Sequence, residues 1–462
     1  MRIQNLFVAV ILGALSVFSY GADVIRLTLV DAVAIGLDRN TDLVKARMEV
    51  TFKKMMADEA FRAFIPKIGF SLNRAVSTRL HDSDSRQYRY EVSVEQLVFD
   101  AGKTKSTYNL SRADATIAKK TLEMQERSLR LDILSSYAKV LGGRDSISLY
   151  ADFLATAEKE LELADIEVQL GTTTILDRDE VATQYESAKL DLLKSKEDYQ
   201  NARIQFGKLL KLPVGQEYQL TGKVDDGFSV VALSLSEEAL FEIARRERID
   251  FVNSALALQK AEFEYETIRD SWLPDISVSG KFFLSGQEWR PNEKGYSVYL
   301  NFSFPFFGSP ASGNTSLSGG SDTTTSSSLS FSPFQDYSYL RQRMQARSGR
   351  YFAKLSRDEL PEDIRREIRL AVLSLEMAAK RLEMQGKQYD IQKKRIEILE
   401  LKTTLGDSRR LDLAKAKIEL YKSAIGRIEQ IIQYVTAAFK LETTVGLLPG
   451  SMRLFKSRVF RI

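Results

Sequence analysis

Residues 68–80 read IGFSLNRAVSTRL, a stretch in which apolar and polar side chains alternate. The odd-numbered positions are small or polar, and the apolar residues at even-numbered positions are Ile68, Phe70, Leu72, Val76 and Leu80. This period of two predicts a strand with one apolar and one polar face. Strands that meet lipid on one face and water on the other have this pattern. A soluble antiparallel sheet with one solvated face is the alternative interpretation.

Three further stretches, 88–98, 276–284 and 296–306, alternate in the same way. We therefore expect four strands, at about 66–80, 88–99, 274–285 and 296–307. Aromatic residues near the strand ends are typical of an interfacial belt, and they are Tyr88, Tyr90, Trp289, Tyr296 and Tyr299.

The chain repeats one structural unit. Ile65-Pro66-Lys67-Ile68 recurs as Leu273-Pro274-Asp275-Ile276, and Leu170-Gly171 recurs as Leu405-Gly406. Each unit is expected to contain a helix, two strands, a long helix, a turn and a helix. The expected divisions are a first repeat at 22–233, a second repeat at 234–449 and a C-terminal tail at 450–462.

The second repeat carries an insertion, because the offset from Gly171 to Gly406 is larger than the offset from Pro66 to Pro274. The Ser/Thr/Gly-rich stretch at about 309–335 accounts for the difference, and its segment 309–332 reads SPASGNTSLSGGSDTTTSSSLSFS. Such a composition buries little apolar surface, so we expect a mobile loop there. Leu329-Ser330-Phe331 could alternatively supply the last strand in place of 300–306.

Most of the remaining chain is expected to be helical. Residues 67–212 and 362–448 contain no proline, which would cost about 3 kcal/mol inside a helix. Residues 103–170 predict one long helix, broken only at Gly142-Gly143. Apolar residues then recur at alternating spacings of three and four from Tyr185 to Phe206 and from Ile418 to Phe439, which is typical of coiled-coil packing.

The N-terminus indicates export. Arg2 precedes an apolar run from Leu6 to Phe18, and Ser19-Tyr20-Gly21 supplies small residues for cleavage, so residues 1–21 are expected to be a signal peptide. No other segment is apolar and long enough to predict a transmembrane helix.

The composition disfavours an enzyme. The chain has no cysteine, and its one histidine, His81, is expected to be a solvated loop residue. With 66 Lys and Arg against 62 Asp and Glu, the charge is balanced and indicates no nucleic-acid partner. The sequence contains no P-loop, dinucleotide fingerprint or zinc motif. No catalytic residue, cofactor or metal is expected.

Four strands cannot close a membrane barrel, because the smallest single-chain barrels use eight. An open edge in lipid leaves backbone groups unsatisfied. If the alternating strands lie in lipid, several chains must therefore share one barrel. The long helices would then extend it as a tube, which is a transport pore that needs no catalysis.

In these features the chain resembles the TolC-type outer-membrane efflux proteins. The resemblance rests on the duplicated unit, the strand exits QLVFDAG at 96–102 and SFPFFG at 303–308, and the turns at 170–172 and 405–407. It implies an α+β, mainly α fold, with long coiled-coil hairpins and four strands per chain in a trimeric 12-stranded β-barrel. It also implies an outer-membrane location, a periplasmic tunnel, a homotrimer, an adaptor protein, and either a resistance-nodulation-division pump or an ABC exporter.

The resemblance also assigns roles at the two turns. The adaptor-docking residues would be Leu170, Gly171, Thr172, Leu405, Gly406 and Asp407. The candidate gate residues are Asp177, Asp412, Arg409 and Lys415. Asp177 and Asp412 would match gate carboxylates, although a carboxylate early in a helix also stabilises its N-terminus. Lys415 stands where the family has a second ring aspartate, and Arg409 adds further positive charge.

The expected function is an exit duct for drugs, other small molecules or proteins, and the sequence does not separate drug efflux from type I secretion. A secreted coiled-coil structural or adhesion protein is the alternative. It would have the helices without lipid-facing strands.

Overall fold

The computed structural model describes residues 25–79, 82–213, 215–270, 273–304, 309–320, 322–333, 338–404 and 410–460. The expected signal peptide, His81, Arg409 and the turn at 405–407 lie outside these ranges. The chain divides into two compact units. Unit 1 comprises the segment ending at Thr41, Glu126–Leu240 and the segment beginning at Ile368, and unit 2 comprises Asp42–Gln125 and Phe241–Glu367. Each unit therefore contains segments from both halves of the sequence.

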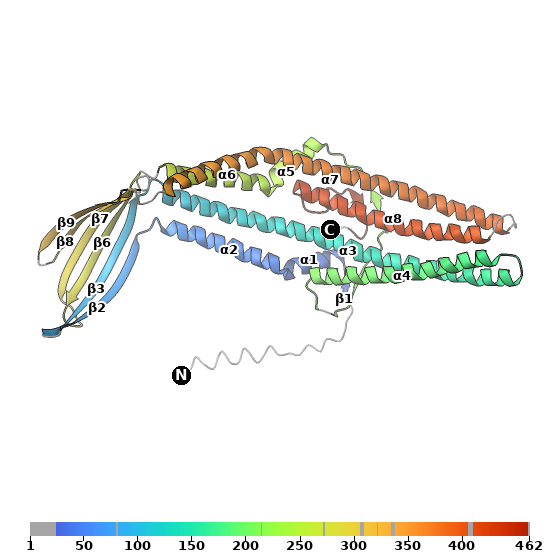
Figure 1. The fold of residues 1–462 in the computed structure, drawn as a ribbon, viewed down its shortest axis with the longest axis horizontal. Helices are drawn as coiled ribbons and strands as arrows, with labels where there is room; N and C mark the ends of the chain where they lie inside the picture. The colour runs from blue at the N-terminus through green and yellow to red at the C-terminus, as the bar shows by residue number, and fades with distance from the viewer. Residues whose placement is uncertain are drawn as a thin grey trace. The chain divides into compact units, whose positions relative to one another are not determined.

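The order of elements is duplicated (Figure 1). The first half contains α1 (Leu29–Arg39), α2 (Thr41–Arg62), β2 (Lys67–Arg79), β3 (Asp82–Phe99), α3 (Lys103–Gln169) and α4 (Ile175–Leu209). The second half contains α5 (Glu237–Glu247), α6 (Ile249–Arg269), β6 (Asp275–Gly286), β7 (Glu293–Phe304), β8 (Ala311–Gly319), β9 (Thr323–Phe331), α7 (Ser338–Thr404) and α8 (Arg410–Val445). Among the described residues, no helix combines the length and apolarity that a membrane span requires.

The two sequence offsets are preserved in the elements. The offset from Pro66 to Pro274 also relates both ends of α1 to those of α5, and the offset from Gly171 to Gly406 relates both ends of α3 to those of α7. The N-caps correspond as well. Thr28 and Asp31 form a capping box before α1, and Ser236, at the equivalent position before α5, accepts a hydrogen bond from Ala239 N at 3.2 Å. Equivalent sequence signals therefore begin equivalent helices.

Unit 2 contains an antiparallel six-stranded sheet in the order β2-β3-β6-β7-β8-β9 (Figure 1). The four expected strands are β2, β3, β6 and β7, and the sheet has two more. β8 and β9 form a hairpin in the stretch that we expected to be a mobile loop, so that expectation is wrong. We expected only one of the segments 300–306 and 329–331 to be the last strand, and this is also wrong, because the described part of the first, 300–304, and the whole of the second are both strands.

The serine-rich hairpin is ordered because it is added to an existing strand. β8 pairs with β7 along its whole length, from Tyr296–Gly319 to Phe304–Ala311. Its hydroxyl groups find partners across the hairpin, with Ser316 Oγ 2.7 Å from Ser326 Oγ. Composition alone underestimates the strand-forming tendency of such a segment, since a neighbouring strand supplies the backbone hydrogen-bond partners that a solvated loop lacks.

Unit 1 is a helical core bordered by two small sheets. β1 (Ile25–Leu27) pairs in parallel with β4 (Tyr218–Leu220), and β5 (Ser229–Val230) pairs antiparallel with β10 (Phe455–Lys456). Half of the residues in the predicted coiled-coil seams of α4 and α8 are buried, and the other half are partly buried. The buried ones are Ala188, Ser195, Phe206, Ile425, Ile428, Val435 and Phe439.

The C-terminal tail at 450–462 is tied to this core by a buried carboxylate. Glu442 is 2% exposed and accepts hydrogen bonds from Met452 N at 2.7 Å and from Gly450 N. Burial raises the pKa of Glu442, although the two backbone N–H groups act in the opposite direction. Tyr434 Oη also donates to Leu454 O at 2.9 Å. The tail therefore satisfies polar groups that would otherwise be buried without partners.

The Gly142-Gly143 pair does not break α3, contrary to our expectation. A Cβ at Gly142 would overlap Ile432 Cδ1 of α8, and one at Gly143 would lie 3.3 Å from Tyr199 Cδ2 of α4. The glycines therefore allow two helices to approach α3 closely, which compensates for their low helix propensity.

We expect Gly142→Leu to lower the free energy of unfolding by about 2 kcal/mol, because the added side chain must displace α8. Gly349→Leu is the matched control, since no atom lies within 4 Å of a Cβ built there in α7. The apparent Tm of the two detergent-purified variants tests the difference. An equal Tm for both would contradict the packing role of Gly142.

Candidate functional site: the sheet faces and the helical turns

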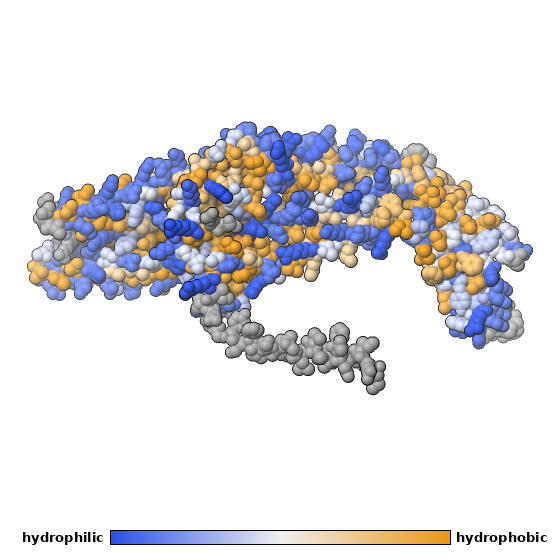
Figure 2. Space-filling model, turned by 180° about the vertical axis from the view of Figure 1, so that it is seen from behind, coloured by the Kyte–Doolittle hydropathy of each residue, from blue (hydrophilic) through white to orange (hydrophobic). Residues whose placement is uncertain are grey.

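The strand register places the apolar residues of the sheet on one face. One row across four strands contains Phe70, Val92, Phe282 and Tyr296, and the next contains Ile68, Val94, Gly280 and Val298. The side chains of these two rows are 38–80% exposed in the described part of the chain, and Phe70 is the most exposed. Figure 2 shows orange hydrophobic residues among white and blue ones over the sheet, at the right of that view. An exposed apolar face of this extent marks contact with lipid or with another protein.

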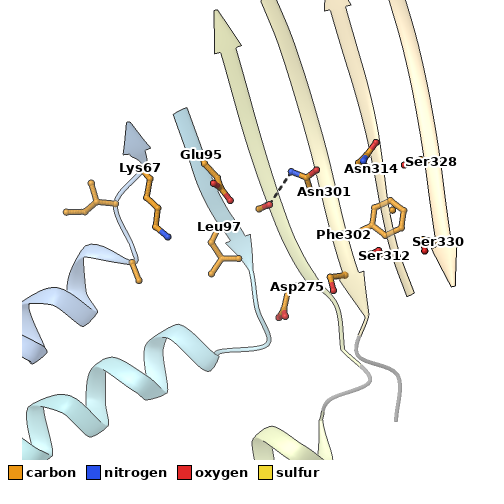
Figure 3. Close-up of a pocket in the computed structure, with 15 residues that line it drawn as sticks. Lys67, Glu95, Leu97, Asp275, Asn301, Phe302, Ser312, Asn314, Ser328 and Ser330 are labelled. Carbon is orange, nitrogen blue, oxygen red and sulfur yellow. Dashed lines mark hydrogen bonds between the residues drawn. The ribbon is translucent and has the colours of Figure 1, made fainter. Parts of the chain in front are cut away.

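The opposite face is polar and carries a groove of about 460 Å³ (Figure 3). All six strands contribute to the groove, and residues in its lining include Lys67, Glu95, Asp275, Asn301, Asn314 and Ser328.

Several charges on this face are paired. Lys103 Nζ of α3 lies 2.7 Å from Asp275 Oδ1, and Lys281 Nζ lies 2.9 Å from Glu91 Oε1. Asn301 Nδ2 donates to Ser277 Oγ at 3.4 Å. The sheet therefore has one apolar face and one polar face.

Part of the expected aromatic belt is present on the apolar face. The Trp289 ring contacts those of Tyr88 and Tyr90 edge-on, with centroids 5.6 and 6.2 Å apart, and Tyr90 Oη donates to Trp289 O at 2.7 Å. Tyr299 is different, because its register with Ser279 and Glu95 places it on the polar face, where Lys281 Nζ lies 5.9 Å from its ring centroid. The alternation places it there although its sequence position resembles that of the other tyrosines.

The first of the two turns, in unit 1, ends α3 with a Schellman motif. Thr172 N donates to Glu167 O and Gly171 N donates to Val168 O, both at 3.0 Å, and Gly171 has φ +74°. Glycine is favoured there because other residues rarely adopt this φ. The turn exposes Leu170, which is 71% accessible. The second turn, with Leu405, Gly406 and Asp407, lies outside the described residues.

Asp177 takes part in the N-cap of α4. Thr174 Oγ1 accepts from Asp177 N at 3.1 Å and donates to Asp177 Oδ2 at 2.7 Å. The next residue, Arg178, joins α4 to α3 by an ion pair with Asp165 at 2.7 Å. The local contacts of Asp177 are therefore those of a capping residue.

Asp412 is exposed in the first turn of α8, and Lys415 follows one turn later. Lys415 Nζ lies 2.7 Å from Glu180 Oε1 of α4, and Lys417 Nζ lies 3.1 Å from Glu160 Oε1 of α3. Glu180 and Lys415 occupy equivalent positions of the two halves, because the offset from Gly171 to Gly406 relates them too. The repeat offset could have identified this pair, which our sequence analysis missed.

The sequence analysis also missed a stripe of apolar residues on the unit 1 part of α7. It recurs at every seventh position and consists of Leu370, Met377, Met384, Ile391 and Ile398. Each of these side chains is 54–68% exposed. A seven-residue apolar repeat is typical of the seam of a coiled coil, and no helix among the described residues buries this seam.

Comparison with known proteins gives a consistent result. The family model described as Outer membrane efflux protein matches residues 35–210. Outer membrane protein TolC of Escherichia coli (strain K12) is 21% identical over 175 residues, which are 35% of this chain and 36% of that protein. The alignment thus spans about a third of this relative.

Solved structures are similar over almost the whole chain. The open state of the Neisseria gonorrhoeae MtrE outer membrane channel has a TM-score of 0.74 at 17% identity, covering 91% of this chain and 89% of that one. A crystal structure of CusC, described in terms of folding and transmembrane channel formation, has a TM-score of 0.72 at 13% identity, covering 91% and 92%. The Campylobacter jejuni CmeC outer membrane channel has a TM-score of 0.72 at 14% identity, covering 90% and 85%.

The fold is therefore that of an outer-membrane channel, mainly α-helical with added strands. The resemblance to the TolC-type outer-membrane efflux proteins is confirmed.

Proposed function

We propose that three copies of this chain form an outer-membrane channel that serves as the passive exit duct of a tripartite export system. The sheet carries the proposal, because it has one exposed apolar face, one polar face with a groove and two strand edges that no strand of the described chain covers. In lipid, closure with other copies satisfies those edges and turns the polar faces toward water. Paired charges and serine hydroxyls suit a conducting surface, and the proposed duct moves its cargo without catalysis.

The apolar stripe of α7 supports assembly of several copies. Five large side chains at heptad spacing cost free energy if they stay in water, about 25 cal/mol per Å² of apolar surface. Packing against a helix of the next copy removes that cost. A secreted coiled-coil adhesion protein, the second candidate, also explains this stripe, but it does not explain the exposed apolar face of the sheet.

Semi-native electrophoresis of detergent-extracted outer membranes tests the assembly. We expect the wild type to run as a trimer and Met384→Glu to run as a monomer, because the substitution places a carboxylate in the apolar seam. Met384→Leu is the control and should remain trimeric. A water-soluble monomeric wild type would eliminate the channel, and a trimeric Met384→Glu would remove the stripe from the interface.

We further propose that the turn at Leu170-Gly171-Thr172 and its equivalent at Leu405-Gly406-Asp407 dock a periplasmic adaptor protein, which joins the duct to a resistance-nodulation-division pump or an ABC exporter. The support is the exposed Leu170 on a turn fixed by its own backbone hydrogen bonds. Such a turn holds an apolar side chain in a defined position, where burial against a partner would be favourable.

Leu170→Glu should therefore reduce export strongly while the trimer remains intact, because it charges the docking surface without altering the Schellman hydrogen bonds. Accumulation of a fluorescent pump substrate in cells measures export, and Leu170→Met is the control. Full export by Leu170→Glu would rule out docking at this turn.

The gate is proposed to depend on the exposed Asp412, with three copies of the carboxylate in one ring, while Arg409 and Lys415 reduce the net negative charge. Asp177 is the equivalent residue of the first half, but its cap contacts account for it without a gate. A ring of carboxylates favours cations.

Asp412→Asn should lower the ratio of cation to anion permeability in planar bilayers. Asp390→Asn, an exposed aspartate on α7, is the control for a simple change in net charge. If both variants have the same ratio, Asp412 does not face the pore.

A further inference from the structure

We infer that β9 is not the free end of the sheet but the strand that pairs with β2 of the next copy, so that each chain contributes six strands to the shared barrel. This inference rests on the proposed assembly of three copies. It assigns the Ser/Thr-rich hairpin a structural place in the wall of the channel and gives a barrel of eighteen strands.

The hairpin is attached to β7 by close contacts. Two glycines of β8 lie under aromatic rings of β7. A Cβ at Gly319 would stand 2.7 Å from Tyr296 Cζ, and one at Gly313 would stand 2.6 Å from Phe302 Cε2. Aromatic side chains that cover a glycine on the neighbouring strand fix the register of the two strands. The glycines of the insertion therefore specify pairing between β7 and β8.

The hairpin also extends both faces of the sheet. The alternation of the first four strands continues in register through the hairpin. Val298, Leu317 and Thr325 form one row on the apolar face, whereas Asn301, Asn314 and Ser328 form a row on the polar face. Leu317, Leu329 and Phe331 are all exposed on the apolar face. The hairpin thus has the same two-sided character as the strands that precede it, although its apolar face is richer in hydroxyl groups.

The edge strand β9 lacks the features that protect a sheet edge. Natural sheets protect a terminal edge with charged residues, proline or a bulge. β9 reads TTTSSSLSF, without charge or proline, and it pairs with β8 along its whole length without a bulge. Every residue of β9 is exposed. A regular, uncharged edge of this length is suited to pair with another strand.

The direction of the strands fits this pairing. The sheet is antiparallel throughout and has an even number of strands, so β2 and β9 run in opposite directions. β9 of one copy and β2 of the next therefore meet antiparallel, as membrane barrels require. Barrels of about 16–18 strands enclose an aqueous channel, and their diameter grows with strand number. With the hairpin in the wall, the pore would accordingly be wider than that of a barrel to which each chain contributes four strands.

Disulfide cross-linking tests the pairing, because the chain has no cysteine of its own. Ser330→Cys in β9 is combined in turn with Lys67→Cys, Ser71→Cys or Asn73→Cys in β2, all on the polar face. Within one chain, β2 and β9 are separated by four strands, about 24 Å at about 4.8 Å per strand, so a bond within the chain is excluded. After mild oxidation, we expect at least one pair to shift the protein from monomer to covalent dimers and trimers on denaturing gels.

Ser303→Cys in β7 provides the matched control. Ser303, Ser312 and Ser330 lie in one row, so this cysteine has the same height and face as Ser330→Cys. Because β8 and β9 lie beyond β7, Ser303→Cys should form no bond with the same β2 cysteines. In a variant that lacks residues 309–332, β7 becomes the edge, and Ser303→Cys should then cross-link.

The outcomes separate the two proposals. Cross-links from Ser303→Cys in the full chain would overturn the six-strand contribution, as would a trimer that forms none from Ser330→Cys. A monomeric protein by mass measurement in detergent would instead refute the proposed assembly of three copies.

Discussion

The backbone groups along the two edges of the sheet in unit 2 are the constraint on which the proposed assembly depends. Each unpaired N–H or C=O in lipid costs several kcal/mol, and β2 and β9 together present a long row of them. An apolar face can be covered by lipid, but an edge can be satisfied only by another strand. The sheet order makes β2 and β9 the two edges, since every other strand has a neighbour on both sides. Closure with further copies then follows from hydrogen bonding more than from hydrophobic contact.

Duplication supplies the helical part of the molecule with matched pairs of elements. In unit 1, equivalent positions of the two halves meet at Glu180 and Lys415, where one half carries the acid and the other the base. Such an exposed ion pair adds less than about 1 kcal/mol, so it identifies which helices are neighbours more than it stabilises them. The close approach of α3 to α4 and α8 depends instead on Gly142 and Gly143, where the absence of a side chain permits the contact.

The sequence was sufficient to predict the elements that have a strong period. The alternation in 68–80, the two repeat offsets and the coiled-coil seams all correspond to observed strands and helices. Gly171 was identifiable for the same reason, since a glycine directly after a long helix commonly ends it in the left-handed conformation. The pairing of Glu180 with Lys415 was missed, because a charge on a helix surface does not by itself indicate which neighbouring helix it faces; only the repeat offset relates the two positions.

The Ser/Thr-rich hairpin shows why composition was misleading. A loop was expected because serine and glycine bury little apolar surface and glycine has a low β-propensity. That reasoning holds for a segment that stands alone in water. The free-energy cost of ordering this segment falls because β7 supplies backbone hydrogen-bond partners for β8. It falls further because the rings of Tyr296 and Phe302 pack over glycines of β8. At Gly313 and Gly319 the absence of a side chain allows the aromatic rings of β7 to lie against β8, so these glycines favour an ordered strand. The hydroxyl groups then pair across the hairpin, as Ser316 and Ser326 do, and keep the polar face of the sheet polar. A segment of low intrinsic preference thus becomes a strand because its neighbour fixes its register.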